Sequence, residues 1–280
     1  MIWRTAPPAL LVVACAPGAP SPVIPPVALD QVHMKPITDY LDSAVAAGAS
    51  PGAVLAISKA GVRFVYGTGQ LGADQPSRPG PQTIYDLASL TKVVALVPLV
   101  MMAVDEGRLD LDAPVQRYVP AFGGAEKSRI TIRMLLVHAG GLPAWRPLFR
   151  EVASRAEALA LTDSTPLEAP PGTTSTYSDL GAIVLTQVIE TIYHERLDSL
   201  LTYRLAVPLG MTSTGYRPPR DLLERIAPTE LDSWRGRVLR GEVHDENAAI
   251  MDGVSGHAGL FSCAEDLLTY AEWLIDQWYG

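Results

Sequence analysis

Residues 93–102 form an unbroken run of apolar side chains, and the run directly follows the tetrapeptide Ser-Leu-Thr-Lys at 89–92. An apolar run of this length predicts a helix buried in the core, with its N-terminus at the serine. Positions i and i+3 share one face of a helix, with Cβ atoms about 5–6 Å apart. Ser89 and Lys92 are therefore expected to lie side by side at a helix end that carries partial positive charge.

A hydroxyl and an amine placed in this way can share a proton, which makes serine a nucleophile without the help of histidine. The chain has 16 serines and four lysines, so chance alone predicts roughly 0.2 Ser-x-x-Lys matches. The alternative is that Ser89 caps the helix and Lys92 is solvated. A lysine within an apolar run is harder to leave in water, so we favour a catalytic pair.

The composition is that of a globular protein, with 48% hydrophobic and 19% charged residues in a chain of 280. A net charge of −8, without a cluster of Lys and Arg, argues against a nucleic-acid partner. We find no His-Glu-x-x-His motif and no Cys/His cluster, so we expect neither a metal nor a cofactor. Of the two cysteines, Cys263 is expected to be a small buried hydrophobic residue.

The N-terminal residues predict an exported lipoprotein. A positive residue and a short apolar segment precede Val-Val-Ala-Cys at 12–15, which resembles a bacterial lipobox. Cys15 would then carry the lipid, and a proline-rich tether would follow within residues 1–34. This places the protein on the periplasmic side of the envelope, with membrane contact only through the lipid. Because a proline pair interrupts the apolar segment, a plain secretory signal or a misassigned start remains the alternative.

The hydrophobic periodicity predicts a hairpin, then a long helical middle, then a final helix. The expected elements, in order, are a helix at 33–47, strands at 53–58 and 62–66, the helix after Ser89, a helix at 130–138, helices near 153–161, 180–193 and 197–205, a weak strand near 237–240 and a helix at 265–278. Pro98 is expected to kink or shorten the helix in which it lies.

A second candidate group is Tyr-Ser-Asp at 177–179, on an expected loop directly before a helix. A phenol needs a neighbouring cation to act as a base near neutral pH, because its ordinary pKa is ~10. Lys92 could be that cation. The alternative is a turn tyrosine, with Asp179 capping the next helix.

These motifs together resemble the serine β-lactamases of class C, the D-alanyl-D-alanine carboxypeptidases among the penicillin-binding proteins, and the β-lactamase-like esterases. The segments that carry the resemblance are 89–92, 106–112, 135–143, 171–172, 177–179, 208–211 and 256–262, in the family's order. The resemblance implies that Ser89 is the acylated nucleophile and Lys92 the residue that activates it. Tyr177 would be the general base and later the acid.

The same resemblance implies an α+β fold, in which an antiparallel sheet flanked by helices lies beside an all-helical domain, with the active site between them. The hydrolase domain would then cover residues 35–280. Residues 35–82 and about 245–280 would form its mixed part, and 83–244 its mainly helical part. The family places further strands and a terminal helix after the point where this sequence ends, so we expect the C-terminal strands to be missing.

Two departures from the family pattern affect the expected chemistry. The family usually has Tyr-x-Asn where this chain has Tyr-Ser-Asp, and an ionised Asp179 that faced Lys92 would favour the ammonium and shift proton transfer towards Tyr177. The family's third motif, Lys-Thr-Gly or His-Thr-Gly, is also absent. His257, in His-Ala-Gly, is a candidate substitute that would orient substrate; the alternative is a structural turn histidine.

The sequence therefore predicts a monomeric serine hydrolase that acts through an acyl-enzyme on cell-wall D-Ala peptides, β-lactams or small esters. A Ser-His-Asp hydrolase fits less well, because Gly253-Val-Ser-Gly-His257 lacks the last glycine of Gly-x-Ser-x-Gly. A protein without turnover is the alternative from another class: an envelope-binding or sensor lipoprotein that keeps the fold. Without the third motif, this chain alone could be inactive.

Overall fold

The structure is a computed structural model that describes residues 29–72 and 75–279. The lipidation predicted at Cys15 and the signal and tether up to residue 28 lie outside the described residues, and the last residues of the predicted segment 1–34 already belong to a helix that begins at Gln31. Across the described ranges, none of the helices has the length and apolar character needed to span a membrane.

An N-terminal helix and a hairpin form one side of the molecule, as the periodicity predicts. The helix is α1 (Gln31–Ala46), and the antiparallel strands are β1 (Gly52–Lys59) and β2 (Val62–Gly69). Ala60 and Gly61 join the strands, both with positive φ, at 50° and 79°. A two-residue turn of this kind matches the natural twist of a hairpin.

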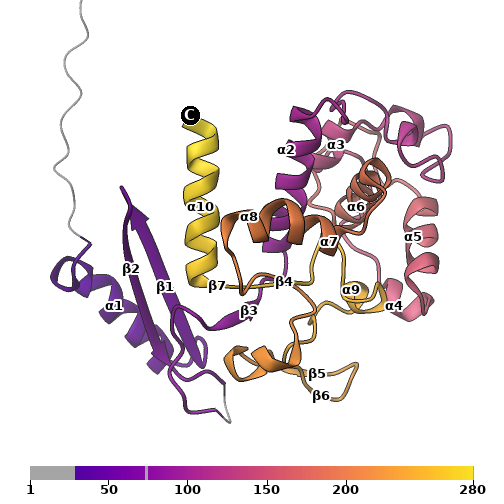
Figure 1. The fold of residues 1–280 in the computed structure, drawn as a ribbon. Coiled ribbons are helices and arrows are strands. Elements are labelled where there is room, and N and C mark those ends of the chain that lie inside the picture. The colour runs from indigo at the N-terminus through magenta and orange to yellow at the C-terminus, as the bar shows by residue number, and fades with distance from the viewer. Residues whose placement is uncertain (1–28, 73–74, 280) are drawn as a thin grey trace, which may run out of the picture.

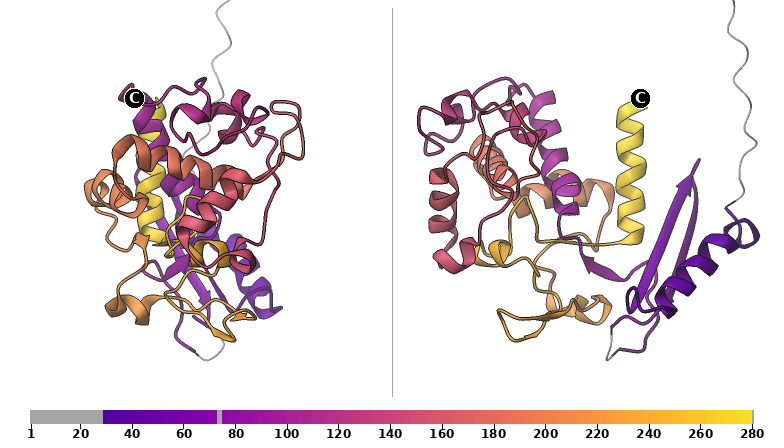
Figure 2. Two further views of the ribbon diagram at one scale, coloured as in Figure 1. Left: turned by 90° about the vertical axis from the view of Figure 1, so that its right-hand side faces the viewer. Right: turned by 180° about the vertical axis from the view of Figure 1, so that it is seen from behind.

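The last helix, α10 (Ala264–Tyr279), lies on the opposite side of the hairpin from α1 (Figures 1 and 2). Arg63 on β2 fixes this arrangement, because its Nε donates to Glu272 of α10 over 3.0 Å. The bond to Arg63 lowers the pKa of Glu272 to about 2, and a second bond from Ser58 of β1 adds to the effect. The hairpin is therefore attached to the body of the protein partly through one carboxylate.

A second sheet connects the centre of the chain to its C-terminal part. It consists of β3 (Ile84–Asp86), β7 (Leu260–Cys263) and β4 (Gly215–Tyr216), with β7 in the middle and antiparallel to both neighbours. These strands are two to four residues long, and all four residues of β7 are buried. The sequence did not predict them, because so short a buried strand shows no alternation of apolar and polar side chains.

The remaining elements are mainly helices, of which α3, α5 and α7 pack against α6 (Figure 1). Helix α6 is buried along most of its length. The elements of this part are α3 (Ile132–Leu136), α4 (Leu148–Glu151), α5 (Arg155–Ser164), α6 (Asp179–Tyr193), α7 (Leu197–Leu201), α8 (Val207–Leu209), α9 (Glu246–Ile250) and the small strand pair β5 (Leu231–Asp232) and β6 (Arg237–Val238). This part holds the main hydrophobic core.

The helix that follows Ser89 runs past Pro98 without being shortened. It contains a π-helical segment, Lys92–Leu96, and continues as α2 (Val97–Asp105). A proline has no N–H, and its ring clashes with the carbonyl four residues earlier, so a wider turn accommodates it where an α-helical turn would not. The same combination recurs at Thr202–Ala206, a second π-helical segment placed two residues before Pro208.

The π turn has a direct consequence for packing. Within it, the N–H of Val97 bonds to the carbonyl of Lys92, five residues back. The carbonyl of Val93, which an α-helix would pair with that N–H, accepts instead from the Tyr270 hydroxyl on α10 over 2.5 Å. Burial raises the pKa of Tyr270 to about 12, so the hydroxyl stays a donor. Tyr270 thus links α10 to the helix that carries the candidate nucleophile.

Candidate active site

A tight turn presents Ser89 at the N-terminal end of its helix. Asp86, the last residue of β3, accepts the Ala88 N–H with one carboxylate oxygen and the His244 N–H with the other, both over 2.8 Å. Ala88 has φ 44°, a left-handed conformation that a residue with a side chain rarely adopts. Burial raises the pKa of Asp86, against the effect of these two bonds. The turn leaves Ser89 exposed.

Lys92 points back towards Ser89 from the π-helical segment, with only 7% of its surface exposed. Its Nζ lies 3.0 Å from Ser89 Oγ, 3.0 Å from the carbonyl oxygen of His257 and 2.7 Å from Asp179 Oδ1. Asp179 Oδ1 lies within ion-pair distance of Lys92 Nζ, but the two groups are not aligned for a hydrogen bond. The contact is therefore mainly electrostatic. Lys92 is therefore a buried ammonium surrounded by oxygens.

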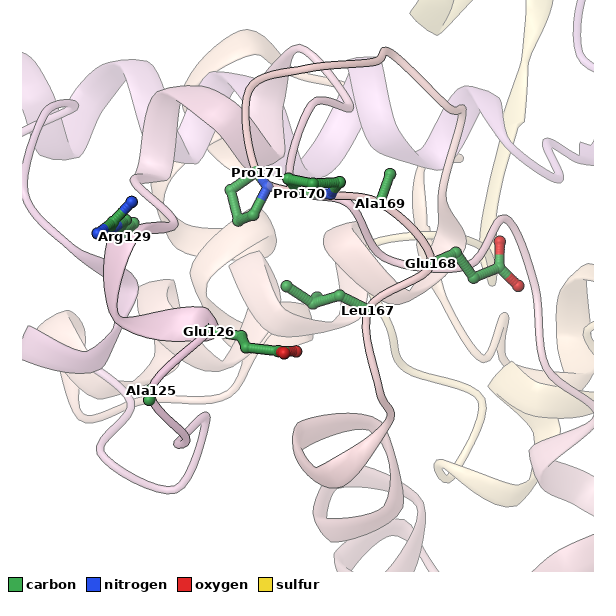
Figure 3. A pocket seen from close by; sticks show the side chains of 8 residues that line it. All are labelled: Ala125, Glu126, Arg129, Leu167, Glu168, Ala169, Pro170 and Pro171. Carbon is green, nitrogen blue, oxygen red and sulfur yellow. The ribbon is translucent and has the colours of Figure 1, made fainter.

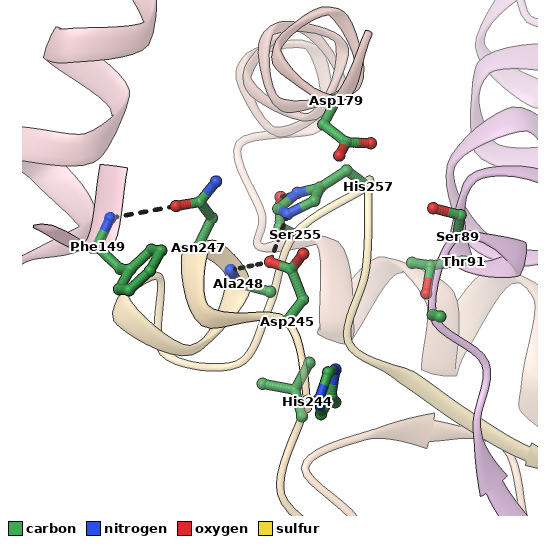
Figure 4. A network of polar contacts seen from close by, with 12 residues as sticks. Ser89, Thr91, Phe149, Asp179, His244, Asp245, Asn247, Ala248, Ser255 and His257 are labelled. Atoms are coloured by element: carbon green, nitrogen blue, oxygen red, sulfur yellow. Dashed lines mark hydrogen bonds and ion pairs between the residues drawn. The ribbon is translucent and has the colours of Figure 1, made fainter. Parts of the chain in front are cut away.

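Asp179 faces Lys92 and does not cap α6. The cap is Ser178, whose Oγ accepts the Gly181 N–H over 3.2 Å and donates to the carbonyl of Pro143 over 2.6 Å. Asp179 is the first residue of the helix, and Figure 4 shows its side chain pointing from α6 towards the His257 loop. Of the two positions that the sequence left open, the structure has the one next to Lys92.

Tyr177 stacks on the same ammonium. Its ring centroid lies 4.8 Å from Lys92 Nζ and 4.6 Å from the ring of His138. The side chain is 53% exposed. Tyr177 is thus brought to the pair predicted from the sequence, at the solvent-facing side of the cluster.

His138 is a site residue to which sequence reasoning gave no role. Its Nδ1 accepts the Ser178 N–H over 3.1 Å, which requires that nitrogen to be unprotonated. Burial lowers the pKa of His138, the charge of Lys92 lowers it further, and Asp179 opposes both. A neutral imidazole therefore supports the Tyr177 ring. The sequence signal was a titratable residue at the end of the mainly apolar segment 130–138, two residues before the glycine pair at 140–141.

His257 lies in the site through its backbone alone. Its side chain is 1% exposed and turns away from Ser89, with Nε2 2.9 Å from Asp245 Oδ1 and Nδ1 2.8 Å from Ser255 Oγ (Figure 4). The imidazole is therefore not placed to orient substrate, because its own cluster engages both ring nitrogens. What reaches the site is the carbonyl that holds Lys92.

Asp245 anchors the His257 loop to α9. Its Oδ1 accepts the Ala248 N–H over 2.7 Å, as the cap of that helix, besides facing His257. Burial alone would raise the pKa of Asp245, but the charge and hydrogen bond of His257 outweigh burial and bring it down to about 2. The contact between the partly exposed Asp245 carboxylate and the buried His257 ring holds in place the peptide whose carbonyl meets Lys92.

The comparisons with known proteins show the family to which the chain belongs. The model of the β-lactamase family matches residues 37–278. The chain belongs to the β-lactamase family. A candidate D-alanyl-D-alanine carboxypeptidase of Escherichia coli (strain K12) is 33% identical over 234 residues, which cover 72% of this chain and 53% of that protein. The chain thus spans about half the length of this relative.

Solved structures of the family have the same fold. A class C β-lactamase from Rhodobacter sphaeroides superposes with a TM-score of 0.69 at 25% identity, over 83% of this chain and 63% of that one. EstCE1, a hydrolase with promiscuous acyltransferase activity, gives 0.69 at 25% identity, over 86% and 71%. The α+β β-lactamase/transpeptidase-like fold expected from the sequence is confirmed.

In this member of the β-lactamase family, a cavity of about 160 Å³ opens beside the candidate nucleophile. Four candidate site residues and seven aliphatic residues line it. They are Ser89, Lys92, His138 and Tyr177, together with Val93, Leu96, Val97, Leu135, Leu136, Ala182 and Leu185. The cavity is therefore apolar except at the end that carries the candidate catalytic residues.

A larger hollow of about 500 Å³ lies elsewhere on the helical part (Figure 3). Its lining comes from two short segments and consists of Ala125, Glu126, Arg129, Leu167, Glu168, Ala169, Pro170 and Pro171. None of these side chains carries a hydroxyl or a thiol. Size therefore does not identify the site in this molecule, and we place it at Ser89.

In the part of the chain that the structure describes, the remaining titratable groups form neither a metal centre nor a reactive thiol. Among the described residues, no group of three or more His, Cys, Asp and Glu side chains could hold a metal ion. Cys263 is fully buried and free, as predicted. Burial raises the pKa of its thiol, which keeps it protonated and unreactive. Cys263 is a packing residue.

Proposed function

We propose that the protein is a serine acyl hydrolase that forms an acyl-enzyme on Ser89. The observation that carries this proposal is the contact of 3.0 Å between Ser89 Oγ and the Nζ of Lys92, a lysine that is only 7% exposed. Burying an ammonium is costly unless oxygens surround it, so a lysine held beside an exposed serine is well explained by a role in chemistry.

In the proposed reaction, Ser89 Oγ bonds to the substrate carbonyl carbon, and the bond to the leaving group breaks. The Ser89 proton passes to Tyr177 and from there to the leaving group. Lys92, with Asp179 Oδ1 2.7 Å from its Nζ, acts mainly as a donor to Oγ. The N-terminal end of the helix favours the oxyanion. Water then releases the acid.

The substrate classes that we propose are cell-wall D-Ala peptides, β-lactams and small esters. The first two classes correspond to the candidate carboxypeptidase and the class C β-lactamase to which the chain is similar, and the hydrolase with promiscuous acyltransferase activity is compatible with the third. We further propose that the protein works as a monomer on the periplasmic side of the envelope, lipidated at Cys15.

One observation favours a second candidate, an envelope-binding or sensor protein without turnover. The Nζ of Lys92 already contacts three oxygens, Ser89 Oγ, the His257 carbonyl and Asp179 Oδ1, and donates to the first two, so it is not placed to accept the Ser89 proton. If Tyr177 does not take over as the base, the site would bind its ligand without cleaving it.

Turnover with three substrates separates these candidates. We would measure hydrolysis of a chromogenic cephalosporin, a p-nitrophenyl ester and a D-Ala-D-Ala peptide by the full chain, by Ser89→Ala and by Asp179→Asn. The hydrolase proposal expects turnover of at least one substrate, lost in Ser89→Ala. It expects Asp179→Asn to change the preference between ester and β-lactam more than it reduces acylation. Binding without turnover would favour the second candidate, and equal turnover by Ser89→Ala would refute Ser89 as the nucleophile.

A further inference from the structure

The cavity beside Ser89 is polar at the end that carries the candidate catalytic residues and apolar elsewhere. Seven of its eleven lining residues are aliphatic, contributed by the nucleophile helix, α3 and α6. Leu135, Ala182 and Leu185 form a buried wall, and Val93 lies half exposed at 49%. An apolar hollow next to an exposed nucleophile is a place where apolar substrate surface can be removed from water.

The cavity offers little to a charged ligand. Lys92 is the one formally charged side chain among the described residues that line it. Its Nζ already contacts Ser89 Oγ, the carbonyl of His257 and Asp179 Oδ1. His138 is neutral, because its Nδ1 accepts the Ser178 N–H. A carboxylate or ammonium in this cavity would lose its hydration without gaining a partner.

The size of the cavity limits the group that it can hold. Its volume, about 160 Å³, is close to that of the engineered apolar cavity of about 150 Å³ that takes up benzene, a molecule of six carbons. A chain longer than about six carbons would have to leave the cavity or displace the wall.

We propose that this cavity binds the acyl chain of the substrate, and that the substrate is an ester of an unbranched aliphatic acid of about six carbons. The inference rests on the proposed function, because it concerns acylation of Ser89. The Ser89 oxygen bonds to the acyl carbon, the bond to the alcohol oxygen breaks, and the Ser89 proton ends on that alcohol. The alkyl chain lies between α6 and the nucleophile helix.

The test is the acylation rate across a series of p-nitrophenyl esters from acetate to decanoate, read from the pre-steady-state release of p-nitrophenol. We expect the rate to rise about fourfold per methylene up to about six carbons, then to fall. Leu185→Ala removes part of the wall and should move the optimum to longer chains by about two carbons. Ala182→Val narrows the cavity and should move the optimum to shorter chains.

Leu180→Ala is the matched control. Leu180 is fully buried on the same helix as Leu185 but does not line the cavity. It should lower stability by a similar amount while leaving the chain-length profile unchanged. A flat profile in the unmodified protein, or the same shift in both leucine variants, would overturn the inference.

Failure of the proposed function would look different. A fluorophosphonate that reacts with activated serines without needing the cavity should label Ser89 in every variant. If it labels Ser89 while the esters show no chain-length optimum, the acyl site is wrong and the hydrolase proposal stands. If neither the phosphonate nor any ester modifies Ser89, both proposals fail.

Discussion

The bond between Tyr270 and the π turn gives a quantitative test of how the nucleophile helix is held. Tyr270→Phe removes one oxygen and leaves the carbonyl of Val93 without the donor that reaches it over 2.5 Å. Tyr270 is 7% exposed, so water cannot easily take its place. A buried acceptor that loses its partner costs about 1–3 kcal/mol. We expect the free energy of unfolding to fall by that amount, and Tm to fall by roughly 2–4 °C per kcal/mol.

The assay is urea unfolding of the full chain, with Tyr279→Phe as the control. Tyr279 lies on the same helix and is 83% exposed, so its variant should unfold within ~0.5 kcal/mol of the parent protein. A second variant tests the cause. Pro98→Ala lets the helix return to α-helical pairing, in which the Val97 N–H reaches the carbonyl of Val93. In that background, Tyr270→Phe should cost less, by about 0.5 kcal/mol or more. Equal costs in both backgrounds would refute the link between proline, π turn and tyrosine.

Three further predictions concern titratable groups. The lowered pKa of Asp245, about 2, contributes about 2 kcal/mol to the free energy of unfolding above pH ~4, and this contribution is lost as the pH falls towards 2. Asp245→Asn should therefore be less stable than the parent protein near neutral pH and equally stable in acid. Asn247→Ala, a neighbouring amide without charge, should show a pH-independent difference in urea unfolding. The pKa of Glu272 is also lowered, to about 2, so this carboxylate likewise stabilises the protein above pH ~4. Its side chain is 32% exposed and screened by solvent, so Glu272→Gln should lower the free energy of unfolding by about 1 kcal/mol at pH 7 and by less below pH ~4. The pKa of His138 is lowered, so the neutral imidazole contributes to stability above its ordinary pKa of ~6.5, and this contribution is lost as the pH falls below that value. In His138→Asn the amide oxygen can accept the Ser178 N–H, so Tm should fall less on acidification than in the parent protein.

The sequence was informative where a regular pattern or a motif exists. The hairpin, α6 and α10 follow from hydrophobic periodicity, and all three form close to the predicted residues. The Ser-x-x-Lys spacing on an apolar helix brings Ser89 and Lys92 to hydrogen-bond distance, as the helical repeat requires. Of the two effects expected of Pro98, a kink or a shortened helix, the shortening does not occur, because the π turn accommodates the proline.

What the sequence could not supply depends on contacts between distant segments. The strands β3 and β7 are too short to show a period, and each exists because the other lies beside it. No local pattern distinguishes a histidine that supports Tyr177, such as His138, from one that supports a loop. For His257 the pattern suggested a side chain aimed at substrate, whereas Asp245 and Ser255 hold the ring and only the carbonyl meets Lys92.

The central claim, that Ser89 is a nucleophile activated by its contact with Lys92, is tested most directly by covalent labelling. The measurement is the intact mass of the full chain over time with a fluorophosphonate, followed by peptide mapping. We predict one adduct per chain, located on Ser89, absent in Ser89→Ala and formed about 10²–10⁴-fold more slowly in Lys92→Met. No adduct, an adduct elsewhere, or an unchanged rate in Lys92→Met would contradict it.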